Sequence, residues 1–126
     1  MINEQGSYSE VVIESDVRIK DGKLDVNGSI YQRGTPLHAD YVFESGYELE
    51  SIQEHAEFMW KNKHLRSIQP VTTDESGLEV VEVGSHFRSI LEELEKAHIY
   101  IDQLHKQNKV LEERLAMIEE KRGKIG

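Results

Sequence analysis

A repeating pattern of apolar residues spans positions 87 to 118 of this 126-residue chain. The apolar side chains recur at alternating steps of three and four residues, which is the heptad spacing of a coiled coil. A pattern with this average period of 3.5 residues stays in contact only when helices wind around each other with a left-handed twist. At ~1.5 Å per residue the repeat predicts a rod about 48 Å long. We therefore predict a coiled coil over residues 87–120.

Ten positions form the predicted seam, and nine of them are apolar. The flanking e and g positions are mostly polar, which favours a coil between separate chains over a helix packed on a globular core. We therefore expect the chain to assemble with copies of itself. The a positions are Phe87, Leu94, Ile101, Asn108 and Leu115, and the d positions are Ile90, Ala97, Leu104, Leu111 and Ile118.

The charges beside the seam favour parallel chains. In a parallel coil each g residue faces the e residue of the next heptad on the neighbouring chain. Arg114 then faces Glu119, and Glu93 faces His98. These pairs indicate a parallel arrangement.

The number of strands is less constrained by the seam. Asn108 is its one polar residue, and its amide is best satisfied opposite its own copy, which sets the register at a cost in stability. Asparagine at an a position is frequent in dimers, whereas Phe87 and Leu91 at the start of the coil suit a wider, three-stranded interior. The heptads alone are compatible with two or three strands.

Residues 1–33 carry short runs of β-branched residues, separated by the turn signals Asp21-Gly22 and Asn27-Gly28. Apolar and polar residues alternate at 17–20 and 23–26, which is the period of a half-buried strand. An isolated hairpin is marginally stable in water. We expect this β-rich segment to pair with a partner chain or to pack on the rest of the protein.

Residues 34–86 are predicted to be a connector that contains one short helix. Ser51 and Glu54 form a capping box, so a helix is expected over about 52–63. Residues 41–44 are predicted to be extended, residues 72–77 to be a loop and residues 78–84 to be a short strand. The predicted fold class is an elongated α+β protein with short N-terminal strands, the capped helix and a long C-terminal helix in a parallel trimeric coil.

Composition excludes several classes of function. The net charge is −9, with 24 acidic and 15 basic residues, which disfavours nucleic acid as a partner. The chain has no cysteine, so it can hold neither a disulfide nor a thiolate metal site. Neither a signal peptide nor a membrane-spanning stretch is predicted, so we expect synthesis in the cytoplasm without membrane insertion.

Between the strands and the coil, the order of short motifs resembles a known module. The stretches Asp40-Tyr41-Val42-Phe43-Glu44 and Asn62-Lys63-His64-Leu65 are its most specific parts. With Leu24–Ile30 and the terminal coil, they resemble the C-terminal module of tail-fibre-like and adhesin-like surface proteins from phages and bacteria of the Bacteroidetes group. The resemblance covers about residues 22–120.

This resemblance implies a homotrimeric tail-fibre component of a phage or phage-like particle, which acts in fibre assembly and in attachment to a host or another surface. Its implied partners are its own copies, other tail or fibre proteins and a host receptor. The alternative function is a cellular coiled-coil adaptor or scaffold, for which a dimer is expected. The exposed loops around Gly34 and at 72–77 are the places where a receptor is expected to bind.

No catalytic, cofactor or metal site is predicted, and we do not expect an enzyme. His98 and His105 lie on one side of the coil but two turns apart, about 10 Å, which is too far for one metal ion. They are interpreted as rim residues that make the oligomer sensitive to pH. Ser15 and Lys20 resemble the serine and base of self-cleaving fibre chaperones, and self-cleavage is a less favoured alternative.

Four aromatic residues in the connector are interpreted as packing residues. They are expected to join the capped helix to the neighbouring extended segment through apolar contact. They are Tyr41, Phe43, Phe58 and Trp60.

Overall fold

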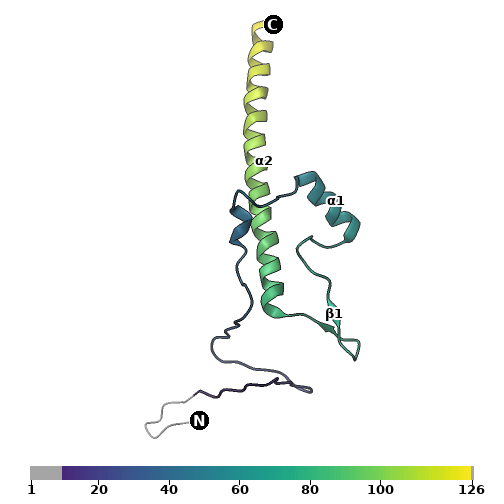
Figure 1. Cartoon of the computed structure of the whole chain (residues 1–126). Coiled ribbons are helices and arrows are strands. Elements are labelled where there is room, and N and C mark those ends of the chain that lie inside the picture. Colours follow the sequence, from purple (N-terminus) through teal and green to yellow (C-terminus); the bar gives the residue numbers. More distant parts are fainter. Residues whose placement is uncertain (1–9, 126) are drawn as a thin grey trace. The chain divides into compact units, whose positions relative to one another are not determined.

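The computed structural model describes residues 10–125 and divides the chain into two units, one ending at Tyr31 and the other beginning at Gln32. It is mostly helical (Figure 1). Its described elements, all in the second unit, are the 3₁₀ helix η1 (Asp40–Phe43), the helix α1 (Ile52–Asn62), the strands β1 (Thr72–Thr73) and β2 (Glu79–Val80), and the helix α2 (Val83–Ile125).

The described part of the first unit, residues 10–31, contains no strand, so the short strands predicted there are absent from these residues. The backbone bends at Asp21-Gly22 and Asn27-Gly28, as the turn signals indicate. The apolar side chains remain exposed because no second layer of structure covers them. Residues 1–9 of the predicted β-rich segment lie outside the described residues.

The segment predicted to be extended at 41–44 is instead largely the 3₁₀ helix η1. The Val42 amide donates to the Ala39 carbonyl at 3.0 Å. Ala39 and Val42 are 0% and 3% exposed, and η1 packs against α2. A 3₁₀ turn places residues three apart on one side, whereas a strand places them on opposite faces. Burial of both side chains against one helix therefore favours the turn.

The predicted capped helix is confirmed as α1, with Ser51 as its N-cap. The Ser51 hydroxyl accepts from the Glu54 amide at 3.1 Å, which satisfies one of the free N–H groups of the first turn. The helix ends at Asn62, because Lys63 has a left-handed φ of 60° and its amide donates to the Met59 carbonyl at 2.8 Å.

Strands β1 and β2 form a small antiparallel hairpin in which Thr72 lies opposite Val80 and Thr73 lies opposite Glu79. The Asp74 carboxylate closes its turn by accepting from the amides of Ser76 and Leu78, at 2.8 and 3.0 Å. The predicted loop at 72–77 is therefore a strand followed by a turn. The predicted strand at 78–84 is shorter, because α2 begins at Val83.

Helix α2 starts before the predicted coil at residue 87 and continues beyond residue 120. The Glu82 carboxylate accepts from the Ser85 amide, and the Glu82 carbonyl accepts from the His86 amide at 3.0 Å. Hydrogen bonds from Ser85 in particular lower the pKa of Glu82 to about 2, so this N-terminal cap is anionic. Among the described residues, neither α1 nor α2 is both long enough and apolar enough to cross a membrane.

Candidate functional site

The predicted seam lies entirely on α2, and all ten of its residues are exposed in the single chain. Phe87, Ile101 and Leu111 are 54%, 59% and 59% exposed. Exposed apolar residues that lie singly on a surface are ordinary, but a continuous stripe of them along a helix marks a contact surface. We therefore treat the seam as the main candidate functional surface.

The connector covers a different side of α2. Glu93, Lys96 and Tyr100 are buried there, at 5%, 3% and 6% exposure. At 100° per residue these three lie about a quarter turn from the seam residues of the same heptads. The chain thus uses one side of α2 to hold its own connector and leaves the seam side uncovered.

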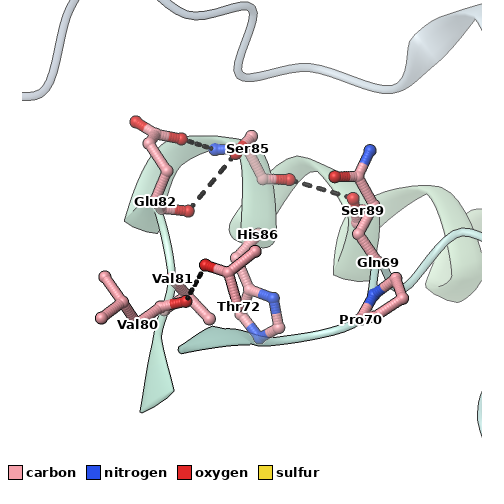
Figure 2. A pocket seen from close by; sticks show the side chains of 9 residues that line it. All are labelled: Gln69, Pro70, Thr72, Val80, Val81, Glu82, Ser85, His86 and Ser89. Carbon is pink, nitrogen blue, oxygen red and sulfur yellow. Dashed lines mark hydrogen bonds between the residues drawn. The ribbon is translucent and has the colours of Figure 1, made fainter. Parts of the chain in front are cut away.

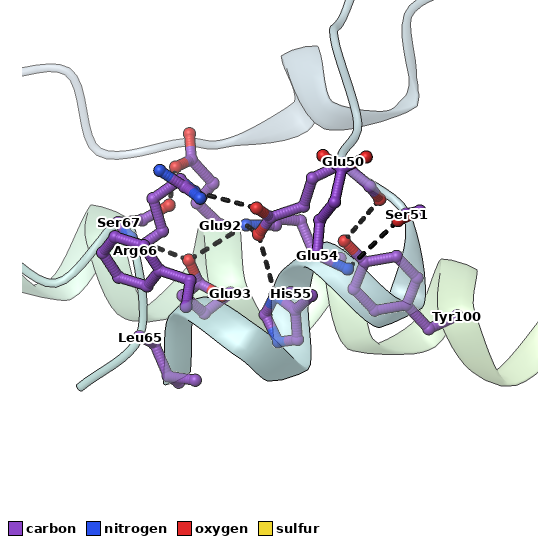
Figure 3. Close-up of polar contacts among 12 residues, drawn as sticks. Glu50, Ser51, Glu54, His55, Leu65, Arg66, Ser67, Glu92, Glu93 and Tyr100 are labelled. Atoms are coloured by element: carbon purple, nitrogen blue, oxygen red, sulfur yellow. Dashed lines mark hydrogen bonds and ion pairs between the residues drawn. The ribbon is translucent and has the colours of Figure 1, made fainter. Parts of the chain in front are cut away.

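The connector is held by a cluster of charged side chains centred on Glu50 (Figure 3). The carboxylate of Glu50 accepts from His55 Nδ1 at 2.9 Å and from Arg66 Nε at 2.8 Å. It also accepts from Lys96 Nζ at 3.3 Å, which joins the connector to α2. We call Glu50, His55, Arg66, Glu93 and Lys96 the Glu50 cluster.

Glu93 completes this cluster from α2. Its Oε1 atom accepts from Lys96 Nζ at 3.2 Å and from the Ser67 amide at 2.8 Å. Its Oε2 atom is buried and has no hydrogen-bond partner in the described structure. The carboxylate expected to face His98 of a neighbouring copy is therefore already bound within its own chain.

Burial and hydrogen bonding act in opposite directions on the two carboxylates. Burial tends to raise the pKa of Glu50, but hydrogen bonds from His55, Arg66 and Lys96 outweigh it and leave the pKa below 4.5. Burial likewise raises the pKa of Glu93, while hydrogen bonds from Ser67 and Lys96 lower it further than burial raises it. Both groups are therefore anionic near neutral pH.

Tyr100 connects the cluster to the rest of the connector. Its hydroxyl donates to the Glu50 carbonyl at 2.9 Å, and its ring lies 5.0 Å from that of His55. Burial, followed by the negative charges of Glu50 and Glu93, raises the pKa of Tyr100 to about 12. Tyr100 therefore remains a hydrogen-bond donor at neutral pH.

The aromatic packing predicted for the connector is only partly present. Trp60 and Phe43 are 67% and 61% exposed, so the prediction that they join the capped helix to its neighbour is wrong. Arg66 lies 4.0 Å above the Phe58 ring. Tyr41 donates to Glu92 on α2. Cationic and hydrogen-bonded contacts thus take the place of the predicted apolar ones.

The other candidate residues are not brought together into a site. His98 and His105 are exposed on α2, and among residues 10–125 no three His, Asp or Glu side chains form a metal-binding group. Ser15 and Lys20 are both exposed, and the described structure records no hydrogen bond between them.

A small hollow of about 200 Å³ lies between the hairpin and the start of α2 (Figure 2). Thr72, Glu82 and Ser85 are among its lining residues. Its polar groups bond to one another, since Thr72 donates to the Val80 carbonyl at 3.2 Å and Glu82 caps α2. These contacts serve the local fold.

Comparison of the chain with protein-family models, curated proteins and solved structures gave no match. The tail-fibre resemblance accordingly remains a prediction from short motifs. The surfaces described above are the basis for a functional proposal.

Sequence reasoning predicted the Ser51 cap and a helix over the heptads, but it did not predict the Glu50 cluster. Glu50 and Lys96 are 46 residues apart, and isolated charged residues in a sequence are usually solvated. One available signal was Tyr100, a large ring at a g position of a coil whose flanks are otherwise mostly polar. It indicates that a second element covers this side of the helix.

Proposed function

We propose that this chain is a structural subunit that assembles through α2 into a parallel coiled-coil oligomer. The observation that carries the proposal is the uncovered seam: the connector packs on one side of α2 while all ten seam residues stay exposed. Burial of nine apolar side chains per chain supplies the driving force for association.

The C-terminal half of α2 provides independent support. Every residue from Asn108 to Ile125 is exposed, so no other described element packs on this part of the helix. In proteins most helix stability comes from packing of an apolar face, and isolated helices are marginal in water. A partner helix on the seam supplies this packing.

We further propose that the oligomer is a trimer that acts as a tail-fibre component of a phage or phage-like particle, in fibre assembly and surface attachment. The motif resemblance and the aromatic start of the seam support three strands. Its partners are then its own copies and other fibre proteins. A receptor binds at exposed segments, of which Gly34 and residues 74–77 are the best placed.

A cellular coiled-coil adaptor is the second candidate function. The specific observation in its favour is Asn108, because a single asparagine at an a position is typical of two-stranded coils. The two functions predict different masses, three chains for the fibre component and two for the adaptor.

Two matched substitutions test the seam. Leu111 at a d position and Val110 at a c position are neighbours on α2, and they are 59% and 47% exposed in the single chain. We expect Leu111→Asp to dissociate the oligomer, because a carboxylate would be buried between chains. Val110→Asp is expected to leave the oligomer intact, since its position faces solvent in a coil.

Light scattering of both variants, with circular dichroism at 222 nm during heating, measures the difference. Loss of mass and of helix only in Leu111→Asp supports the proposal. Equal mass and equal helix content in the two variants contradict the proposal, because both positions are exposed to solvent on a helix that has no partner.

A further inference from the structure

The Asn27-Gly28 turn is a feature of the chain that the proposed assembly does not use. Asn27 is one of four asparagines in the sequence, and it is the one that glycine follows. Both residues are exposed and lie in a part of the chain without helix or strand (Figure 1). Asparagine is a thermally labile residue, and its lability depends on the backbone amide that follows it. The surroundings of the Gly28 amide therefore decide how stable Asn27 is.

The Gly28 amide is open to attack on the side chain before it. Among residues 10–125, no backbone hydrogen bond from this amide is recorded. Apart from the chain neighbours of Gly28, no atom lies within 4 Å of the place that a β-carbon on this residue would occupy. Its φ is 151°, a conformation that glycine adopts at little cost. No recorded contact among the described residues thus holds this amide in place.

The two other asparagines that the structure describes are restrained. The Asn62 side chain donates to the Phe58 carbonyl at 3.0 Å, and the Lys63 amide that follows it donates to the Met59 carbonyl at 2.8 Å. Asn108 lies inside α2, where each amide donates to the carbonyl four residues earlier. At both sites the following amide is already bound and the backbone is fixed.

We propose that Asn27 is a site of spontaneous deamidation through a cyclic imide. The Gly28 amide nitrogen bonds to Cγ of Asn27, the bond from Cγ to Nδ2 breaks, and Nδ2 leaves as ammonia with the amide proton. The product is a succinimide ring in the main chain. Water then opens the ring at either carbonyl carbon, which gives aspartate at one and isoaspartate at the other. Water is the only co-reactant.

This reaction changes both the charge and the backbone of the turn. Either product replaces a neutral amide by a carboxylate and makes the net charge of −9 more negative. Isoaspartate also routes the main chain through Cβ and so lengthens it by a methylene group. The alternating residues 23–26 end directly before the turn, so the longer link shifts them relative to residues 29–31. The modification is therefore a slow, irreversible change of the first unit that leaves the residues of α2 unaltered.

One protease digest measures all three described asparagines. The full-length folded protein is incubated at mildly alkaline pH, which favours attack by the amide nitrogen. It is then cut briefly at acidic pH by a protease specific for glutamate, which yields the peptides 15–44, 58–75 and 96–112, each with one asparagine. Mass spectrometry detects the exchange of amide for carboxylate, and fragmentation distinguishes isoaspartate from aspartate. Asp21 in the first peptide does not interfere, because a carboxylate loses no ammonia.

We expect Asn27 to deamidate at least about tenfold faster than Asn62 and Asn108, because a glycine amide has no β-carbon to hinder its approach and is unbound here. We also expect both aspartate and isoaspartate from Asn27. Similar rates at the three sites overturn the proposal. Formation of aspartate alone also overturns it, because direct hydrolysis of the side chain passes through no ring.

Two glycine variants test the attacking group. Gly28→Ala is expected to slow the reaction at Asn27 by about tenfold or more, because the added methyl group hinders the nitrogen. Gly22→Ala is the matched control, since Gly22 lies in the same segment with a φ of 150°. It is expected to leave the rate at Asn27 unchanged. An unchanged rate in Gly28→Ala, or equal slowing in both variants, contradicts attack by the Gly28 amide.

Unfolding separates the effect of structure from that of sequence. In guanidinium chloride the rates at Asn62 and Asn108 are expected to increase, because their helical restraints are lost, whereas the rate at Asn27 is expected to change little. A large increase at Asn27 means that the folded chain protects this turn, and it overturns the proposal.

Discussion

A single lysine shows how this chain holds its connector. Lys96 is 3% exposed and lies between the carboxylates of Glu50 and Glu93. Burial of an ion pair is expensive, but removal of one member is more so, because it leaves a buried charge without a partner. Lys96 is therefore needed for docking of the connector on α2.

Substitution of this lysine tests its role. Lys96→Met is expected to weaken connector docking by about 3–5 kcal/mol, because the buried Glu93 carboxylate loses its cation and Glu50 loses one of its three donors. Lys106→Met is the matched control: Lys106 is exposed on the same helix, and its pair with Asp102 contributes about 0.5 kcal/mol or less. Hydrogen exchange of the Ser67 amide, which donates to Glu93, measures docking in both. Equal protection in the two variants contradicts the role given to Lys96.

Acid is expected to release the same contact. Glu50 and Glu93 both have a pKa below 4.5 in the folded chain. A lowered pKa means that the stabilisation is complete above the unfolded value and is lost as pH falls through the lower folded value. Protection of the Ser67 amide is therefore expected to be constant from pH 7 to about 5 and to fall below about pH 4.5.

The replacement of both carboxylates by amides provides the control for this acid effect. The double variant Glu50→Gln with Glu93→Gln leaves the buried Lys96 without an anion, so its Ser67 protection is expected to be low already at pH 7 and to show no further decrease below pH 4.5, since amides do not titrate in this range. Persistence of the same decrease in this variant would assign the effect to other groups.

At the scale of elements, the best predictions came from local signals. The capping box at Ser51 and the heptads of α2 each depend on residues close together in the sequence, and both helices are present, although α2 extends beyond the predicted bounds at both ends. The prediction failed at η1, because burial of Ala39 and Val42 against α2 is a tertiary effect. The Glu50 cluster was missed for the same reason.

The N-terminal segment shows that a local sequence pattern alone does not form a strand. The alternation at 17–20 and 23–26 has the period of a strand, yet residues 10–31 form none. Alternation describes a backbone suited to a sheet, but a ladder also needs a partner strand and a surface that covers the apolar face. This part of the prediction depends on partners that the sequence does not specify.

The cap of α1 has a measurable contribution. Ser51→Ala is expected to destabilise α1 by about 1 kcal/mol, because the Glu54 amide loses its acceptor. Ser76→Ala in the hairpin turn is a suitable control, since the recorded bond at Ser76 uses its backbone amide. Hydrogen exchange of the Glu54 amide should increase only in Ser51→Ala. An unchanged rate contradicts the cap.

At the scale of the whole molecule, the two sides of α2 differ in what covers them. The side that carries Lys96 and Tyr100 binds the connector within the chain, and the exposed seam side is where we propose that other chains bind. This division explains why charged residues are buried in a small protein whose apolar seam is exposed. It also places the connector beside the proposed contact between copies.

Asn108 is expected to lower the thermal stability of the proposed oligomer and to fix the register of its chains. Asn108→Ile removes a polar amide from the seam, so the melting temperature should rise, by an amount that corresponds to on the order of 1–3 kcal/mol per chain. The variant is also expected to show mixed masses in light scattering, because the polar mark of register is gone. A lower melting temperature with a single mass contradicts this role.

The most direct measurement of the assembly is the mass of the unmodified chain by sedimentation equilibrium at neutral pH over a range of concentrations. One chain has a mass of 14.5 kDa. The proposed trimer predicts a single species with three times this mass. A species of two chains contradicts the trimer and favours the adaptor, and a mass of 14.5 kDa at all concentrations contradicts the coiled coil itself.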